Sequence, residues 1–592
     1  MQRGRSAGAA PTQGGRHAGY NRHVTRRLSW IVLLALGAAL LVGAATFDHA
    51  AWPSLVGDES TYLMAAQSLA FDHDYLYTAA DYHRFVALTG RQPDGVILQR
   101  SPRGLTFAKP LLYPLAIAPF VRLAPARGPA IANALFVVLA ALAAARALER
   151  RLGPAAALWV AACLFASVAF AYVFWAHEDA FLLALTAAGL AAATAWRTED
   201  GPPLRRTALA GPALGGVLLA LVTLGRPVYA GLLLAGAAIT ARDGADGGRR
   251  LRAFAVAAVA TLIVAGGAHR LASGVWNPYG GERQGFYSAI GFPEVNLQPG
   301  LWDKWIAEGG TGSWLDGFGL SWGLDGRLLG WNSLYFLAGR DLGLLPYFLP
   351  GLLALFLFRP GGGRAPLLLA VALGVLLLFL LRPFNFFGGG GAIANRYFLP
   401  LYPALWFAVG RPLRARTAVL CGLLAAPFLW PLWSAPRAFP WRPDGTYRWV
   451  TPAAVRLLPF ETTQSHLKPA GREDVVHHDL WVKFLDPSIA PTADNQELVL
   501  AAGATGTLLV GSAEPLRELE LTLPGGGAPP RIGGARIEGP PDGAPAGTWL
   551  LGRLQPRAAH PMWWTQTPFH LYQLSFTSPG PALRFALRRA AR

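Results

Sequence analysis

Residues 28–46 read LSWIVLLALGAALLVGAAT, and this uncharged run decides the class of protein to which the chain belongs. A helix needs about 20 mostly apolar residues to cross a bilayer, so the run can span it with little help from its flanks. The preceding residues contain no Asp or Glu and six arginines: Arg3, Arg5, Arg16, Arg22, Arg26 and Arg27. No convincing small-residue cleavage site follows. We therefore expect an uncleaved first span with its N-terminus inside.

The rest of the chain has the same apolar character. Of its 592 residues, 53% are hydrophobic and only 15% are charged, whereas soluble proteins carry roughly 25% charged residues. The net charge is +18, but the arginines recur in short loops between apolar segments. This pattern indicates membrane topology and excludes nucleic acid as a partner. Cys163 and Cys421 both lie within apolar segments, which argues against a disulfide framework.

Apolar stretches of about 15–20 residues recur along the chain, and each is close to the length that a membrane span requires. They begin near Leu28, Pro129, Pro154, Ala180, Thr207, Val228, Ala253, Leu342, Ala365, Arg396 and Thr417. The predicted fold class is therefore a polytopic α-helical membrane protein with about eleven transmembrane helices.

The segment from Leu111 to Val121 decides the topology. It contains Pro114 and Pro119, which would interrupt a helix, and its length covers about half of the hydrocarbon thickness. If it does not cross, five arginine-rich turns fall on the cytoplasmic side, as the positive-inside rule prefers. These turns are residues 150–151, 197–206, 242–252, 359–364 and 411–416. We therefore expect this segment to lie at the outer interface, with the C-terminus outside.

Three domains follow from this topology. Residues 1–27 form a basic cytoplasmic tail, and residues 28–434 form the transmembrane domain, with large outer loops at 47–127 and 271–341. Residues 435–592 are expected to form an extracytoplasmic β-sandwich. Leu519, Leu521 and Leu523 alternate there with polar residues, and Tyr572, Leu574 and Phe576 alternate in the same way. Alternation of this kind is typical of strands with one buried face.

An acidic pair opens a helical pattern in the first outer loop. Asp58 and Glu59 precede Tyr62, Leu63, Ala66 and Leu69, which places the two acids at a helix N-terminus, where the helix dipole stabilises negative charge. Capping alone explains acids at such a position equally well.

The stretch GDESTYLMAAQSLAFDHDY at residues 57–75 resembles the first-loop signature of GT-C glycosyltransferases. The resemblance is to the branch that includes protein O-mannosyltransferases and aminoarabinose transferases. FAKPLLYPL at residues 107–115 resembles the Lys-Pro-Pro-Leu-Tyr element of the same superfamily, with Leu111 in place of the second proline. GRDLGLLPYFLP and NRYFLPLYP resemble segments of the same bacterial families. Together the similarities cover about the first 430 residues.

The resemblance implies an inverting glycosyltransferase of the bacterial inner membrane. Such an enzyme moves a sugar from a polyprenyl-phosphate carrier to an acceptor hydroxyl on the outer face. Asp58 would then be the general base, with Glu59 binding substrate or supporting Asp58. Lys109, Arg226 and Arg396 would bind the donor phosphate. Basic residues at span boundaries also serve as interfacial anchors, which is the alternative for these three.

A second polar cluster follows the third predicted span. His177, Glu178 and Asp179 would bind substrate or a divalent cation, since imidazole and carboxylates are both metal ligands. No cofactor other than such a cation is implied, and an exposed polar turn is the alternative.

Two other functions remain open: a transporter or flippase for a lipid-linked glycan, and a non-catalytic GT-C-like binding protein. Transporters usually place ionisable residues within their spans, whereas the acids of this chain cluster in the predicted outer loops. The partners expected are the lipid donor, membrane lipid and an unidentified glycan, lipid or protein acceptor.

Overall fold

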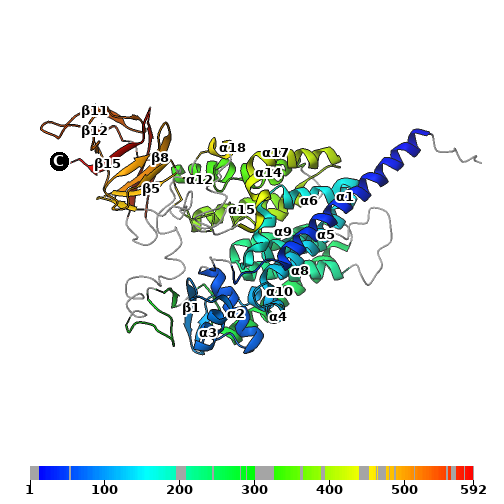
Figure 1. The fold of residues 1–592 in the computed structure, drawn as a ribbon. Helices are drawn as coiled ribbons and strands as arrows, with labels where there is room; N and C mark the ends of the chain where they lie inside the picture. Colours follow the sequence, from blue (N-terminus) through cyan, green and yellow to red (C-terminus); the bar gives the residue numbers. More distant parts are fainter. Residues whose placement is uncertain are drawn as a thin grey trace, which may run out of the picture.

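The computed structural model describes residues 13–590. The exceptions are residues 52–54, 56, 195–208, 243–245, 280–281, 289, 301–325, 360–363, 384, 389–393, 439–452, 460, 462, 465–474, 479, 486–487, 513, 555, 557, 562–567 and 579. The described chain has a helical part, a small lobe at one end of it, and a β-rich region that begins at Val475 (Figure 1).

The helical part follows the apolar stretches of the sequence. Its main helices are α1 (Gln13–Ala45), α5 (Gly128–Leu152), α6 (Ala156–Phe165), α7 (Glu178–Thr194), α8 (Ala210–Gly225), α9 (Ala230–Ala241), α10 (Gly247–Ser273), α15 (Ala365–Leu381) and α17 (Ala415–Ser434). Shorter helices are α12 (Gly326–Ala338), α13 (Leu344–Tyr347), α14 (Leu349–Phe356), α16 (Tyr402–Ala408) and α18 (Ala453–Arg456). Each predicted stretch coincides with at least one helix.

Four helical segments of the described chain are long and apolar enough to cross a membrane. They are Arg22–Ala45, Gly128–Phe165, Gly247–Ser273 and Ala415–Ser434, and four shorter apolar helices accompany them. These segments agree with a multi-pass membrane protein. The count of eleven spans stays a prediction, because helices such as α14 and α16 are only 8 and 7 residues long.

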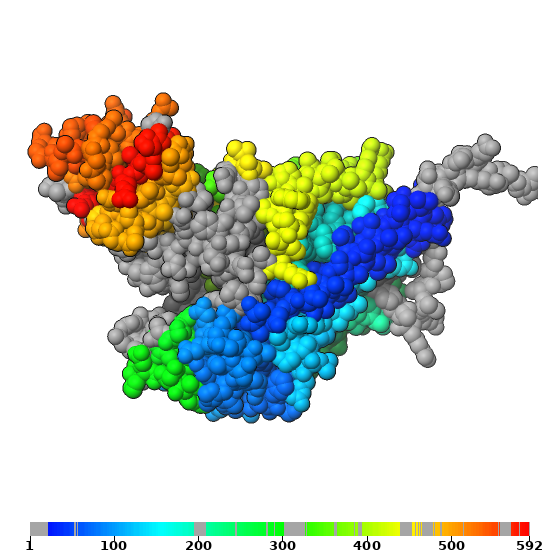
Figure 2. Space-filling view, in the orientation of Figure 1, coloured from blue at the N-terminus to red at the C-terminus, as the bar shows by residue number. Residues whose placement is uncertain are grey.

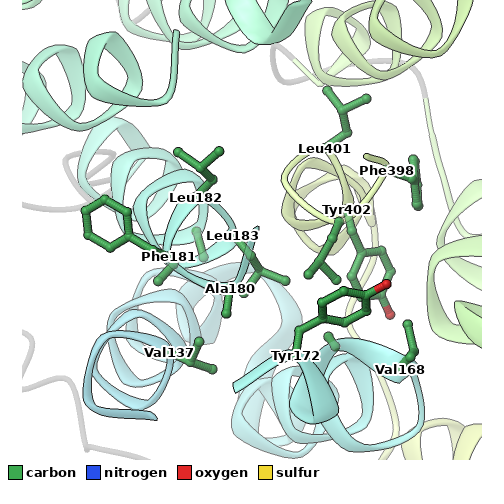
Figure 3. Packing of buried hydrophobic residues seen from close by; sticks show 14 of the residues in the cluster. Val137, Val168, Tyr172, Ala180, Phe181, Leu182, Leu183, Phe398, Leu401 and Tyr402 are labelled. Carbon is green, nitrogen blue, oxygen red and sulfur yellow. The ribbon is translucent and has the colours of Figure 1, made fainter. Parts of the chain in front are cut away.

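Buried side chains from distant parts of the sequence pack around α7. Figure 3 shows Phe181, Leu182 and Leu183 of α7 between Val137 of α5 and the segment that carries Phe398 and Tyr402. The hydroxyl group of Tyr402 donates to the carbonyl oxygen of Cys163 at 3.0 Å, so the polar end of this buried ring has a partner. The first turns of α7 are thus packed on both sides within the helical part.

Helices α1 and α5 are joined by a contact between charged side chains. Arg26, near the start of the apolar part of α1, donates to Glu149 near the end of α5 at 3.2 Å. The start of the apolar part of α1 and the end of α5 therefore lie side by side. The side of the membrane on which each loop lies stays a prediction.

The first predicted loop folds into most of the lobe. It contains α2 (Asp58–Phe71), α3 (Ala79–Thr89), the hairpin β1 (Val96–Ser101) and β2 (Gly104–Phe107), and α4 (Leu112–Leu123). Strand β3 (Arg283–Phe286), from the second predicted loop, pairs with β1 in antiparallel register, so the sheet order is β2-β1-β3. Residues of the two predicted outer loops therefore share one sheet.

The expectation that proline interrupts residues 111–121 is wrong. Helix α4 runs through the whole segment. Pro114 lies in its first turn, where the missing amide hydrogen costs no intrahelical bond, and Pro119 forgoes a single bond. At 12 residues the helix is about 18 Å long, so it is still shorter than a span.

The β-rich region consists of two antiparallel sheets. Their strand orders are β10-β14-β8-β5-β4, with β13 on β14, and β11-β12-β9-β15-β7-β6. The strands are β4 (Val475–His477), β5 (Leu480–Phe484), β6 (Ile489–Pro491), β7 (Leu498–Leu500), β8 (Thr505–Ser512), β9 (Leu519–Thr522), β10 (Arg531–Gly533), β11 (Arg536–Gly539), β12 (Thr548–Gly552), β13 (Ala558–Pro561), β14 (Pro568–Thr577) and β15 (Leu583–Arg589).

The two sheets enclose one apolar core, which contains the predicted alternating residues. Leu519, Leu521 and Leu523 are buried, and so are Tyr572, Leu574 and Phe576. The prediction of a strand-rich C-terminal region is confirmed. This region (orange to red) and the lobe (blue and green) both lie at the end of the molecule away from the start of α1 (Figure 2).

Candidate functional site

Asp58 is the first residue of α2, and the local sequence fixes its position. Gly57 precedes it with a φ of +55°, a left-handed conformation that glycine adopts without steric cost. The amide of Gly57 donates to the carbonyl of Asp94 at 2.9 Å, and its own carbonyl accepts the hydroxyl of Thr61 at 2.6 Å. These bonds tie the start of α2 to the chain just before β1.

Three basic side chains converge on the Asp58 carboxylate. Lys109 Nζ pairs with its Oδ1, His177 Nε2 lies 3.1 Å from Oδ2, and Arg396 Nη2 lies 3.5 Å from Oδ2. Burial acts to raise the pKa of Asp58, but Lys109, the hydrogen bond with His177 and the charge of Arg396 lower it well below its usual range. Asp58 is therefore ionised and held among cations.

The sequence motif His177-Glu178-Asp179 joins the same site at the start of α7. The Nδ1 atom of His177 lies 2.8 Å from Asp179 Oδ2, so the imidazole bridges two aspartates. Arg226, which follows α8, contacts both remaining acids: its Nε is 2.9 Å from Glu178 Oε1, and its Nη1 is 2.9 Å from Asp179 Oδ1. The motif is buried rather than an exposed turn, so that alternative is wrong.

The three carboxylates differ in their access to solvent. The side chain of Asp58 is 24% exposed, whereas those of Glu178 and Asp179 are 2% and 0% exposed. A base must come within hydrogen-bond reach of the proton that it removes. Among these three acids, Asp58 is therefore the one that a group entering from solvent can reach.

Glu59 faces a different environment. It is 1% exposed, and its charge acts on Arg91 and Tyr113. Consecutive helical residues point about 100° apart, so Glu59 turns away as Asp58 faces the cluster. A part for Glu59 in catalysis stays a prediction.

Arg283 is a cation that the sequence analysis missed. It is the first residue of β3, and its Nη2 donates to the carbonyl of Ala108, next to Lys109, at 2.9 Å. Burial lowers the pKa of Lys109, and the charge of Arg283 lowers it further, against the opposing effect of Asp58. The pairing of β3 with β1 brings Arg283 here, and nothing local in the sequence signals it.

Three arginine side chains lie against the ring of Tyr397. The guanidinium groups of Arg226, Arg396 and Arg382 lie 4.7, 5.4 and 5.9 Å from its centroid. Arg396 also lies 5.1 Å from the ring of Trp175, and each such cation–π contact is worth about 0.5–2 kcal/mol. The aromatic rings keep mutually repelling cations close together.

A divalent cation at His177, Glu178 and Asp179 stays a prediction. Among the residues that the structure describes, no group of three or more His, Cys, Asp or Glu side chains is arranged to hold a metal. In the motif, Arg226 contacts one oxygen of each carboxylate, Glu178 Oε1 and Asp179 Oδ1. The acids are neutralised by guanidinium and ammonium groups instead.

Comparisons with known proteins give only remote similarity. No protein-family model matches the chain, and no curated protein matches it. Among solved structures, ArnT from Cupriavidus metallidurans in the apo state has 17% identity and a TM-score of 0.40, covering 69% of this chain and 65% of that one. ArnT bound to undecaprenyl phosphate has 15% identity and a TM-score of 0.37, with coverages of 67% and 60%.

The oligosaccharyltransferase of Archaeoglobus fulgidus in its apo form is the third similar structure. It has 13% identity and a TM-score of 0.38, covering 71% of this chain and 57% of its own. The chain therefore spans less than two thirds of the length of each of these proteins.

Proposed function

We propose that this protein is an inverting membrane glycosyltransferase that moves a sugar from a polyprenyl-phosphate carrier to an acceptor hydroxyl. The observation that carries the proposal is the Asp58 carboxylate, partly open to solvent and held by Lys109, His177 and Arg396. A base and a set of phosphate-binding cations then share one site. Transfer of a sugar from a phosphate requires these two components together.

The charge of the site suits a departing phosphate. Lys109, Arg226, Arg283, Arg382 and Arg396 face the three acids Asp58, Glu178 and Asp179, which leaves an excess of two positive charges. A polyprenyl-phosphate sugar is a phosphodiester with one negative charge, and the released phosphate monoester gains a second. The excess therefore stabilises the leaving group more than the bound substrate, which is the condition for catalysis.

Donor binding would also change the basicity of Asp58. Lys109 and Arg396 serve both the carboxylate and the incoming phosphate, so the phosphate competes with Asp58 for them. Weaker ion pairing raises the pKa of a carboxylate. Asp58 is thus a weak base in the free enzyme and a stronger one once the donor is bound, which limits proton abstraction to the loaded site.

The pH dependence of the reaction tests this coupling. Because the pKa of Asp58 is lowered in the free protein, the acid limb of kcat/KM should lie below the ordinary value for aspartate, about 3.9. The acid limb of kcat reports the donor complex and should lie at higher pH. Steady-state rates measured from acid to neutral pH give both limbs. If the two limbs coincide, the phosphate does not draw the cations away from Asp58.

The donor site is tested by replacing Lys109 with glutamine. Loss of a charge-assisted hydrogen bond costs about 1.5–3 kcal/mol, so the Kd for polyprenyl phosphate should rise about 10- to 100-fold. The control is Arg103→Gln, which removes a charge from the exposed turn between β1 and β2. Binding is measured in detergent micelles. Equal affinity of Lys109→Gln and wild type would place the phosphate elsewhere.

Turnover is the wider test of the proposed function. Purified wild-type protein is supplied with a panel of polyprenyl-phosphate sugars, and released polyprenyl phosphate is measured with and without candidate acceptors. Transport of the intact lipid-linked sugar into the opposite leaflet of proteoliposomes, without release of polyprenyl phosphate, would instead support a flippase.

A further inference from the structure

A short segment between the helical part and the β-rich region is buried against the helical part. We call residues 458–464 the strap, of which the structure describes Leu458, Pro459, Glu461, Thr463 and Gln464. Glu461, Thr463 and Gln464 are 0%, 1% and 4% exposed. Three polar side chains so deeply buried require hydrogen-bond partners, and the partners identify what the strap holds.

Glu461 holds the corner between α12 and α13. Its Oε1 accepts the amide hydrogens of Asp341 at 2.7 Å and of Leu342 at 3.0 Å. The neighbouring amide of Arg340 donates to the carbonyl of Pro459 at 2.9 Å. A Cβ atom on Gly339 would lie 2.2 Å from Glu461 Oε1, so glycine at this position leaves the room that the carboxyl group occupies.

Thr463 and Gln464 hold the chain that follows α15. The Nε2 of Gln464 donates to the carbonyl of Pro383 at 3.1 Å, and its Oε1 accepts the amide of Phe386 at 3.2 Å. Asn332 of α12 closes the network, since it accepts from Thr463 at 2.7 Å and donates to Pro383 at 2.8 Å. The strap therefore joins α12 to the first residues of the segment 383–397.

The far end of that segment carries Arg396 and is tied to the same corner. The amide of Ala394 donates to the carbonyl of Asp341 at 3.0 Å, and the amide of Arg396 donates to the carbonyl of Phe387 at 3.0 Å. Arg396 in turn contacts Asp58 and His177. A continuous chain of contacts runs from Glu461 through Asp341 and Ala394 to Arg396.

We propose that Glu461 is a positioning residue for Arg396. By holding the Asp341–Leu342 corner, Glu461 fixes the described end of the segment, Ala394 to Arg396, in the position that aims Arg396 at Asp58. It thereby links the phosphate site to the strap that leads into the β-rich region. The effect on phosphate affinity rests on the proposed function, whereas the effect on the segment itself does not.

The electrostatics of Glu461 indicate which substitution preserves this role. Burial and the charge of Asp341 raise the pKa of Glu461 well above its usual range, so the group binds its proton readily and needs no cation beside it. Glutamine has the shape of the protonated acid and keeps the accepting oxygen. Glu461→Gln should therefore preserve both amide bonds, and Glu461→Ala should lose them.

The first test is hydrogen exchange of the full-length protein in detergent micelles. Amide exchange at Ala394 and Arg396 should rise about tenfold or more in Glu461→Ala and in Gly339→Ala, which crowds the same carboxyl group, and should stay at the wild-type rate in Glu461→Gln. Peptides from α5 and α7 report whether the variants remain folded. Glu514→Ala, which removes an exposed carboxylate paired with Arg589, is the control.

The second test is the affinity for polyprenyl phosphate. Glu461→Ala should weaken it about tenfold, and Glu461→Gln should restore it. Wild-type exchange rates at Ala394 and Arg396 in both folded alanine variants would overturn the proposal. So would faster exchange with unchanged phosphate affinity. If the wild-type protein binds no polyprenyl phosphate, the proposed function fails, and the exchange measurement still decides whether Glu461 holds the segment.

Discussion

Replacing Asp58 with asparagine is expected to lower the rate of sugar transfer by about 10²- to 10⁴-fold, the usual contribution of a general base. Asparagine keeps the shape of the side chain but cannot take the proton of the acceptor hydroxyl. Affinity for polyprenyl phosphate should be retained or increased, because the neutral amide no longer competes for Lys109 and Arg396. The measurements are release of polyprenyl phosphate and, separately, binding of polyprenyl phosphate.

The matched control is Asp72→Asn at the other end of α2. Asp72 is the C-cap residue of this helix and pairs with Arg84 near the surface at 2.7 Å, so its loss changes the same chemical group outside the site. The variant Glu59→Gln shows which of the two acids, Asp58 or Glu59, turnover depends on. Turnover by Asp58→Asn at the wild-type rate would remove Asp58 as the base, and a loss confined to Glu59→Gln would transfer that role to Glu59.

Replacing Arg226 with glutamine is expected to have the largest effect on stability. Glu178 and Asp179 are almost completely buried, and Arg226 pairs with both at 2.9 Å. Removing one partner from a buried ion pair leaves an uncompensated charge and costs about 3–5 kcal/mol. The free energy of unfolding in mixed micelles should fall by at least about this amount. The contact between Arg226 and the Tyr397 ring is lost as well.

A double variant distinguishes the charge effect from lost packing. Glu178→Gln removes one of the two stranded carboxylates, so Arg226→Gln with Glu178→Gln should be less unstable than the sum of the two single changes. The control is Arg146→Gln, because Arg146 is 64% exposed and pairs with Glu149 at the surface, where an ion pair is worth about 0–1 kcal/mol. Additive single effects would mean that Arg226 stabilises the site through packing alone.

Local features of the chain were predictable because each depends on residues close in sequence. The apolar runs coincide with helices, and Asp58 and Glu59 begin α2 as expected. The apolar residues of the alternating pattern, Leu519, Leu521 and Leu523, are buried as expected. The first two lie in β9, and the third follows it. Lys109, Arg226 and Arg396 were singled out from their flanking motifs and lie together around the acidic side chains. Their roles in phosphate binding stay predictions until binding is measured.

The interruptions of the helical part were less predictable. The stretch that begins near Leu342 forms two short helices, α13 and α14, and the one that begins near Arg396 forms only the short helix α16. Pro346, Pro350 and Pro403 lie in these helices. Helix α4, however, continues through Pro119. Proline therefore marks positions where a helix can end, and tertiary packing decides whether it does.

The sequence by itself determined the membrane class, the strand-rich C-terminal region and the chemical types available for a site. These depend on hydrophobicity and on short-range periodicity, which are fixed by adjacent residues. Only the tertiary structure decided which charges meet. Strand β3 brings Arg283 beside Lys109, Tyr397 gathers three arginines, Arg226 pairs with Glu178 and Asp179, and Glu461 holds the segment of Arg396. The contacts of Arg226 with Glu178, of Arg283 with Ala108 and of Glu461 with Asp341 join residues 48, 175 and 120 positions apart. Such pairings result from the packing of the whole chain, which no local pattern encodes.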